Sequence, residues 1–147
     1  MKKYDEATTS RLENILKSVK TDDDIQEYME KHTKNSFSTF SDYFNSYLIR
    51  NKLDYPSVMN RSNISKNYFY NIINGDRNPG RDKIIALCIG AGMSCYETNR
   101  ALKIAKEGIL YPKDPRDARI MICINNGIKT VTELNIILDD NNLQLIK

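Results

Sequence analysis

The segment that decides the fold is Leu53–Gly75, with the sequence LDYPSVMNRSNISKNYFYNIING. It predicts two short helices joined by a tight turn. We expect Asp54 to cap the first helix, and Pro56 is tolerated in its first turn because an N–H there has no helical partner. Asn63 suits the turn, since asparagine accepts a left-handed backbone at low cost. Ser65 is the expected cap of the second helix, which ends at the closing glycine.

The second of these helices, at about residues 65–74, combines a buried face with an exposed polar face. Phe69 and Ile72 have the spacing of side chains that point inward from a helix. The polar side chains on the other face are Lys66, Asn67 and Asn71. This is the layout of a helix-turn-helix, whose second helix can enter the major groove of DNA. Sequence-specific binding to double-stranded DNA is therefore the leading hypothesis.

Positive charge is concentrated around the same segment. Residues 50–83 carry seven basic and three acidic side chains, whereas residues 1–30 carry five basic and eight acidic ones. The formal net charge of the whole chain is only +3. Because phosphate contacts supply most of the affinity of a DNA-binding module, the local bias supports DNA as the partner. Solvated surface charge alone could give the same count by chance.

The composition is that of an ordinary globular protein. The chain has 147 residues, of which 40% are hydrophobic and 28% charged. That length fits one domain or one domain with an appendage. No apolar run is long enough to span a membrane, and the first residues lack the apolar stretch of a signal peptide. We therefore expect a cytoplasmic protein that has no membrane partner.

Enzymatic activity is not expected. The sequence has no Gly-rich phosphate loop and no nucleophile motif. Its three cysteines, Cys88, Cys95 and Cys123, form no CxxC pair and accompany a single histidine. That spacing argues against a zinc site, and a free cysteine in an apolar run behaves as a small hydrophobic residue. We expect neither a metal nor a cofactor.

Apolar residues recur mostly at helical spacing, which predicts an all-α fold in three segments. Residues 1–36 form an acidic N-terminal helical segment that ends in a polar linker. Residues 37–110 form a helix-turn-helix domain, which begins with a helix from about Ser38 to Asn51. Residues 111–147 form a helical hairpin that extends the same core. The N-terminal helices or the C-terminal hairpin could also contact a protein partner.

The C-terminal half contains an internal repeat. Residues 81–92 align without a gap to residues 116–127, and a further match follows after one gap. The identical pairs of the ungapped part are Arg81/Arg116, Asp82/Asp117, Ile85/Ile120, Cys88/Cys123, Ile89/Ile124 and Gly92/Gly127. Each copy predicts a helix, a glycine C-cap and a second amphipathic helix. We expect two stacked hairpins at residues 81–107 and 116–142, although convergent amphipathic patterning could give a similar alignment.

The residues around the turn match the pattern of a known family. They are Val58, Ile64, Ser65, Phe69, Ile72, Gly75, Arg77 and Pro79, followed by an apolar helix through Leu87 and Ile89. On this order of cap, turn, apolar spacing, glycine and proline, residues 38 to about 107 resemble the Cro/lambda-repressor type of helix-turn-helix domain. This group is also called the xenobiotic-response-element family of bacterial regulators. Members with an added helical C-terminal part resemble the chain more closely.

The resemblance implies roles for individual residues in a transcriptional regulator. Lys66, Asn67 and Asn71 would read bases, because lysine can donate to guanine and asparagine can pair bidentately with adenine. The implied phosphate contacts are Arg61, Ser65, Tyr68, Arg77 and Arg81. Such proteins commonly bind as symmetric dimers, so the C-terminal hairpin becomes the expected homodimer or partner surface. Its candidate residues are Ile136, Ile137, Leu143, Leu145 and Ile146.

Three departures from the family pattern lead to an alternative. Tyr55 and Pro56 occupy the turn where the family usually has a glutamine that steadies a phosphate contact. Met59 replaces the usual alanine, and Asn63 replaces the turn glycine. The alternative is a protein-interaction adaptor that keeps the fold without binding DNA. The acidic N-terminal segment and the modest net charge are compatible with it.

Overall fold

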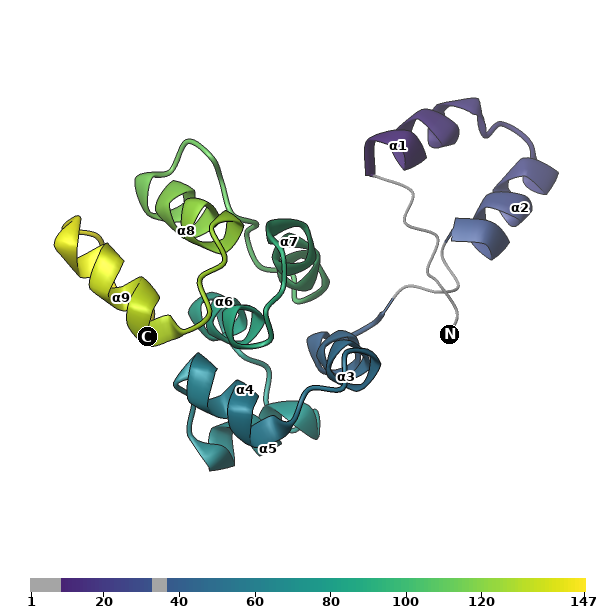
Figure 1. The fold of residues 1–147 in the computed structure, drawn as a ribbon. Helices are drawn as coiled ribbons and strands as arrows, with labels where there is room; N and C mark the ends of the chain where they lie inside the picture. Colours follow the sequence, from purple (N-terminus) through teal and green to yellow (C-terminus); the bar gives the residue numbers. More distant parts are fainter. Residues whose placement is uncertain (1–8, 33–36) are drawn as a thin grey trace. The chain divides into compact units, whose positions relative to one another are not determined.

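A computed structural model describes residues 9–32 and 37–147 of the chain. Within these ranges all regular structure is helical, with nine helices and no strand, which confirms the all-α prediction. The chain divides into two compact units, Met1–Phe37 and Ser38–Lys147 (Figure 1). Most of the predicted linker, residues 33–36, lies outside the described residues.

The first unit is a pair of short helices with little buried surface. Helix α1 spans Thr9–Ser18 and α2 spans Asp22–His32. The Thr21 hydroxyl accepts a hydrogen bond from the Asp24 amide at 3.1 Å. Three aspartates in the first turn of α2 add negative charge where the helix dipole favours it. None of the side chains described in this unit is buried, so the hydrophobic core of the described residues lies in the second unit.

The second unit is built around one buried helix, α6. Its seven helices are α3 (Phe40–Arg50), α4 (Tyr55–Ser62), α5 (Lys66–Ile73), α6 (Arg81–Gly90), α7 (Cys95–Ile104), α8 (Pro115–Asn125) and α9 (Val131–Asp140). Every residue of α6 from Ile84 to Gly90 is buried. Helices α4, α7 and α9 pack against it (Figure 1). A helix that is apolar on all sides is stable only at the centre of such a bundle.

Helix α4 approaches α6 closely at Gly90. A Cβ atom on Gly90 would lie 2.9 Å from the Ser62 backbone nitrogen and 2.9 Å from the Val58 carbonyl oxygen. The Arg61 Nε–H donates to the Gly90 carbonyl oxygen at 2.8 Å across the same contact. Because only glycine leaves room here, residue 90 sets the distance between α4 and the central helix.

Gly90→Ala is expected to destabilise the protein by about 1–3 kcal/mol, because the added methyl group overlaps the backbone of α4. The measurement is the free energy of unfolding in urea. Gly80→Ala is the matched control, since nothing lies within 4 Å of a Cβ atom at Gly80. Equal losses of stability for the two variants would contradict the close contact.

The repeat predicted from the sequence is present as two helical hairpins, α6–α7 and α8–α9. Gly92 and Gly127 follow the first helix of each hairpin with φ angles of +74° and +82°, values that favour glycine. The second helices begin at equivalent caps. The Ser94 hydroxyl accepts from the Glu97 amide, and the Thr130 hydroxyl accepts from the Glu133 amide, both at 3.1 Å. The two copies therefore share their local structure as well as their sequence pattern.

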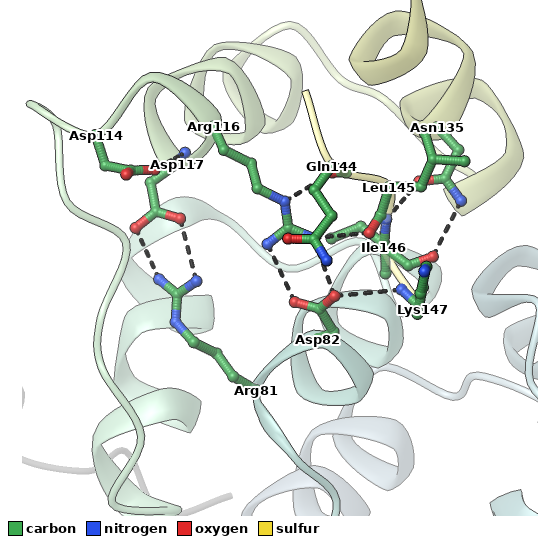
Figure 2. Close-up of polar contacts among 10 residues, drawn as sticks. All are labelled: Arg81, Asp82, Asp114, Arg116, Asp117, Asn135, Gln144, Leu145, Ile146 and Lys147. Carbon is green, nitrogen blue, oxygen red and sulfur yellow. Dashed lines mark hydrogen bonds and ion pairs between the residues drawn. The ribbon is translucent and has the colours of Figure 1, made fainter. Parts of the chain in front are cut away.

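Two arginine–aspartate pairs join the hairpins in a reciprocal way (Figure 2). The Arg81 guanidinium of the first copy donates to both carboxylate oxygens of Asp117, at 3.1 and 2.8 Å. Arg116 of the second copy donates to both carboxylate oxygens of Asp82, at 3.1 and 2.9 Å. Bidentate pairs of this kind are among the strongest side-chain interactions in proteins. We call these four residues the arginine–aspartate clamp.

Each arginine of the clamp also holds the end of its own hairpin. The Arg81 Nε–H donates to the Gly108 carbonyl oxygen, and the Arg116 Nε–H donates to the Gln144 carbonyl oxygen, both at 2.8 Å. Two asparagines at equivalent positions, Asn99 in α7 and Asn135 in α9, bind the backbone that follows the second helix of each hairpin. Asn99 Oδ1 accepts from the Leu110 amide at 2.9 Å, and Asn135 Oδ1 accepts from the Ile146 amide at 2.8 Å.

The tail of each copy then reaches the aspartate of the other copy. The Tyr111 amide donates to Asp117 Oδ2 at 3.0 Å. The Lys147 amide donates to Asp82 Oδ2 at 3.2 Å (Figure 2). Each hydrogen bond from the first copy to Asp117 of the second copy therefore has a counterpart from the second copy to Asp82 of the first. This reciprocity is the signature of an approximate two-fold axis between the hairpins.

The two arginines of the clamp should differ in their effect on stability. Arg81→Ala leaves the Asp117 carboxylate, whose side chain is 8% exposed, without its ion-pair partner. Arg116→Ala leaves Asp82, which is 29% exposed and can be hydrated. We expect losses of about 2–3 kcal/mol for Arg81→Ala and about 1–2 kcal/mol for Arg116→Ala in urea unfolding. Lys113→Ala, at an exposed position, is the control, and the reverse order of the two losses would refute this assignment.

Candidate nucleic-acid interface

Helices α4 and α5 are joined by a three-residue turn whose geometry follows from the sequence. The Asp54 carboxylate caps α4 by accepting from the Ser57 amide at 2.9 Å, and hydrogen bonding to Ser57 lowers the Asp54 pKa. Asn63 ends the helix in the left-handed region, with φ 56° and ψ 44°. Ile64 is buried, and the Ser65 hydroxyl accepts from the Tyr68 amide at the start of α5. Each predicted cap is therefore present.

One face of α5 is fixed to the core. The side chains of Phe69 and Ile72 are fully buried. Helix α3 holds the far end of α5, because the Ser41 hydroxyl donates to the Ile72 carbonyl oxygen and Asn45 Nδ2 donates to the Ile73 carbonyl oxygen at 2.9 Å. The exposed residues of α5 and its C-cap are Lys66, Asn67, Tyr70, Asn71 and Asn74. All three residues predicted to read bases thus lie on the surface of a firmly anchored helix.

Tyr55 has a packing role at the junction of α4 and α5. Its ring meets the Phe69 ring edge-to-face at 5.3 Å between centroids, and the Tyr70 ring at 5.8 Å. Such pairs add to the free energy of burial. Tyr55 therefore helps to fix the first turn of α4 against α5.

A basic cluster lies beside α5 around the ring of Tyr68. The Arg77 guanidinium carbon is 4.7 Å from the ring centroid, and the Lys83 ammonium nitrogen is 5.5 Å from it. Cations at these distances are attracted by the negative face of the ring. We call these three residues the Tyr68 cluster. Lys83 was not among the phosphate contacts expected from the sequence, because only the fold brings the start of α6 to Tyr68.

Two of the arginines proposed as phosphate contacts are engaged within the chain. All three guanidinium nitrogens of Arg81 donate to groups of the C-terminal half, namely Asp117 and the carbonyl oxygens of Gly108 and Ile109. Arg61 donates through Nε to Gly90. These contacts give Arg81 a role in packing the hairpins, and we do not retain it as a phosphate contact. Arg77 is exposed and Tyr68 is half-buried.

The predicted partner surface on the C-terminal hairpin is only partly accessible. Ile136 is 57% exposed, whereas Ile146 is 7% exposed and belongs to the core of the chain. Ile137, Leu143 and Leu145 are half-buried. Ile146 is therefore not available to a partner in this arrangement.

The cysteines and the metal-ligating side chains of the described residues are candidates for an alternative site. Cys88 is fully buried, and burial raises the pKa of its thiol, which keeps it in the unreactive protonated form. Within residues 9–32 and 37–147, no three side chains of histidine, cysteine, aspartate or glutamate gather closely enough to hold a metal ion. No helix in the described part of the chain is long and apolar enough to cross a membrane.

Comparison of the chain with protein-family models, with curated proteins and with solved structures gives no match in any of the three.

Proposed function

We propose that the chain is a sequence-specific DNA-binding transcriptional regulator in which α5 reads the major groove. The observation that carries the proposal is the polar face of α5. Lys66, Asn67 and Asn71 are exposed on a helix whose opposite face is fully buried. A rigid helix that presents lysine and asparagine side chains can match the donors and acceptors of guanine and adenine.

The surroundings of α5 provide candidate contacts to the DNA backbone. Arg77 and Lys83 of the Tyr68 cluster place two positive charges next to the helix. The N-terminus of α5, capped by Ser65, offers backbone N–H groups and the positive end of a helix dipole. Contacts of this type position a protein on the duplex without reading its sequence.

The family resemblance supports the same function. The cap at Ser65 and the buried positions of α5 belong to the pattern that carries the resemblance. Asn63 has a left-handed backbone at the position where the family usually has glycine. Such a regulator would act in the cytoplasm of a bacterial cell. It would bind duplex DNA, commonly as a dimer at two half-sites about one helical turn apart.

An adaptor that binds another protein is the second candidate. The specific observation in its favour is exposed apolar surface on the C-terminal hairpin, where Ile122 is 50% and Ile136 is 57% exposed. Tyr55 and Pro56 also occupy the turn where the family usually has a glutamine that steadies a phosphate contact. An adaptor of this kind would use the hairpin as its working surface and would not depend on Lys66 or Asn67.

Selection from a random pool of duplex DNA, repeated at two salt concentrations, tests the proposal. We expect an enriched site and an affinity that falls steeply with salt. Asn67→Ala and Asn71→Ala should each weaken binding to the enriched site by about 1–3 kcal/mol, with a relaxed preference at one base position. Arg77→Ala should weaken binding to all sequences and reduce the salt slope by about one.

Lys129→Ala is the matched control for the loss of a positive charge, because Lys129 is exposed in the loop between α8 and α9. It should leave both the affinity and the salt slope unchanged within error. The absence of any enriched sequence from the wild-type selection would overturn the DNA proposal and favour the adaptor.

A further inference from the structure

The contacts between the two hairpins form a self-complementary surface. Arg81 and Asp82 of the first copy face Asp117 and Arg116 of the second, with equal bidentate geometry in both directions. A surface related to its partner by a two-fold axis is the kind of surface that pairs identical subunits. Here both halves of the pair belong to one chain.

We propose that this interface also forms between two copies of the chain, which exchange their C-terminal hairpins. Residues 38–111 of each chain, which we call the body, would bind residues 114–147 of the other. The clamp and the two tail contacts at Tyr111 and Lys147 all join the body to the hairpin. Exchange would therefore preserve every one of these interactions. The occupant of the surface is a second copy of the same chain, and the proposal does not depend on DNA binding.

Hydrogen bonds within the hairpin join its C-terminal tail to its two helices. Arg116 donates to the carbonyl oxygens of Gln144 and Leu145, and the Asn135 side chain hydrogen-bonds to the backbone amide and carbonyl of Ile146. These hydrogen bonds lie within residues 115–147 and would survive the exchange. The hairpin therefore carries its share of the interface with it.

The segment that would act as the hinge is short and exposed. Residues 111–114 lie on the surface, and the Asp114 amide donates to the Tyr111 carbonyl oxygen at 3.0 Å, which closes a tight turn. This turn reverses the chain and lets the hairpin fold back on its own body. Proline at positions 112 and 115 restricts the backbone on both sides of the turn. A short, stiff hinge favours exchange whenever the turn cannot close.

The linker between the body and the hairpin decides whether the closed monomer or the exchanged dimer is populated. A short linker gives the hairpin an effective concentration of roughly millimolar at its own body. At micromolar protein concentration the closed monomer is therefore favoured, and the wild-type chain should run as a monomer at about 10 µM. A change that prevents residues 111–114 from forming their turn should therefore produce the exchanged dimer.

The first test removes the turn and leaves the interface intact. Deletion of Pro112 and Lys113 joins Tyr111 directly to Asp114, so no residues remain in which the chain can reverse. We expect this variant to be a dimer at about 10 µM by native mass spectrometry and light scattering, with the helical content of the wild type. Insertion of four glycine and serine residues after Lys113 is the control and should give a monomer. A deletion variant that is a folded monomer would overturn the proposal.

The second test covers the case in which the deletion variant fails to fold. Arg81→Asp and Asp117→Arg each place like charges across the clamp within one chain. When the two variants are mixed, exchange pairs the aspartate at position 81 with the arginine at position 117, and the other interface is native. We expect a heterodimer in the mixture and neither homodimer alone. A mixture that contains no heterodimer would overturn the proposal.

Discussion

The reciprocal pairing of Arg81 with Asp117 and of Arg116 with Asp82 is the constraint on which the C-terminal half depends. Charged pairs that are largely removed from water contribute little net free energy, because desolvation offsets their attraction. Their geometry nevertheless penalises any other placement of the hairpin, since a displaced hairpin would leave the buried Asp117 and the half-buried Asp82 without their arginines. In this chain the clamp selects one arrangement of the α8–α9 hairpin on the central helix, and the apolar burial of Ile120, Leu134 and Leu138 stabilises it.

The same central helix also positions the candidate DNA-reading surface. Helix α4 packs against α6 at Gly90, and the turn at Asn63 then directs α5. Helix α3 holds the other end of α5 through Ser41 and Asn45. The orientation of α5 is therefore set by contacts on its buried side, so its exposed side chains can vary without loss of the fold.

Much of the fold could be predicted from local signals in the sequence. Capping residues such as Asp54 and Ser65 fix where helices begin, and these signals act over three or four residues. The repeat identified which residues correspond, including Arg81 and Arg116. It could not indicate whether the copies stack by translation or by a two-fold rotation, because identical residues are compatible with either. The crossed pairing, and with it the engagement of Arg81, is visible only in three dimensions.

Only part of the candidate site could be predicted, because some of its contacts join segments that are distant in the sequence. The exposed polar face of α5 follows from helical periodicity, but Lys83 and Tyr55 take their places through packing between segments that are distant in the chain. Gly90 carried no signal of its close contact, since nothing in its local sequence distinguishes it from an ordinary helical glycine. The roles of Lys83, Tyr55 and Gly90 depend on residues that are close in space but distant in the sequence.

A double-mutant cycle across the clamp tests the two-fold arrangement most directly. Urea unfolding of Arg81→Ala, Asp117→Ala and the double variant gives the coupling free energy of one pair, and Arg116 with Asp82 gives that of the other. The crossed arrangement predicts a coupling of about 1 kcal/mol or more for each pair, and a much smaller value for Arg81 with Asp82. Coupling near zero for both crossed pairs would contradict the arrangement on which the account rests.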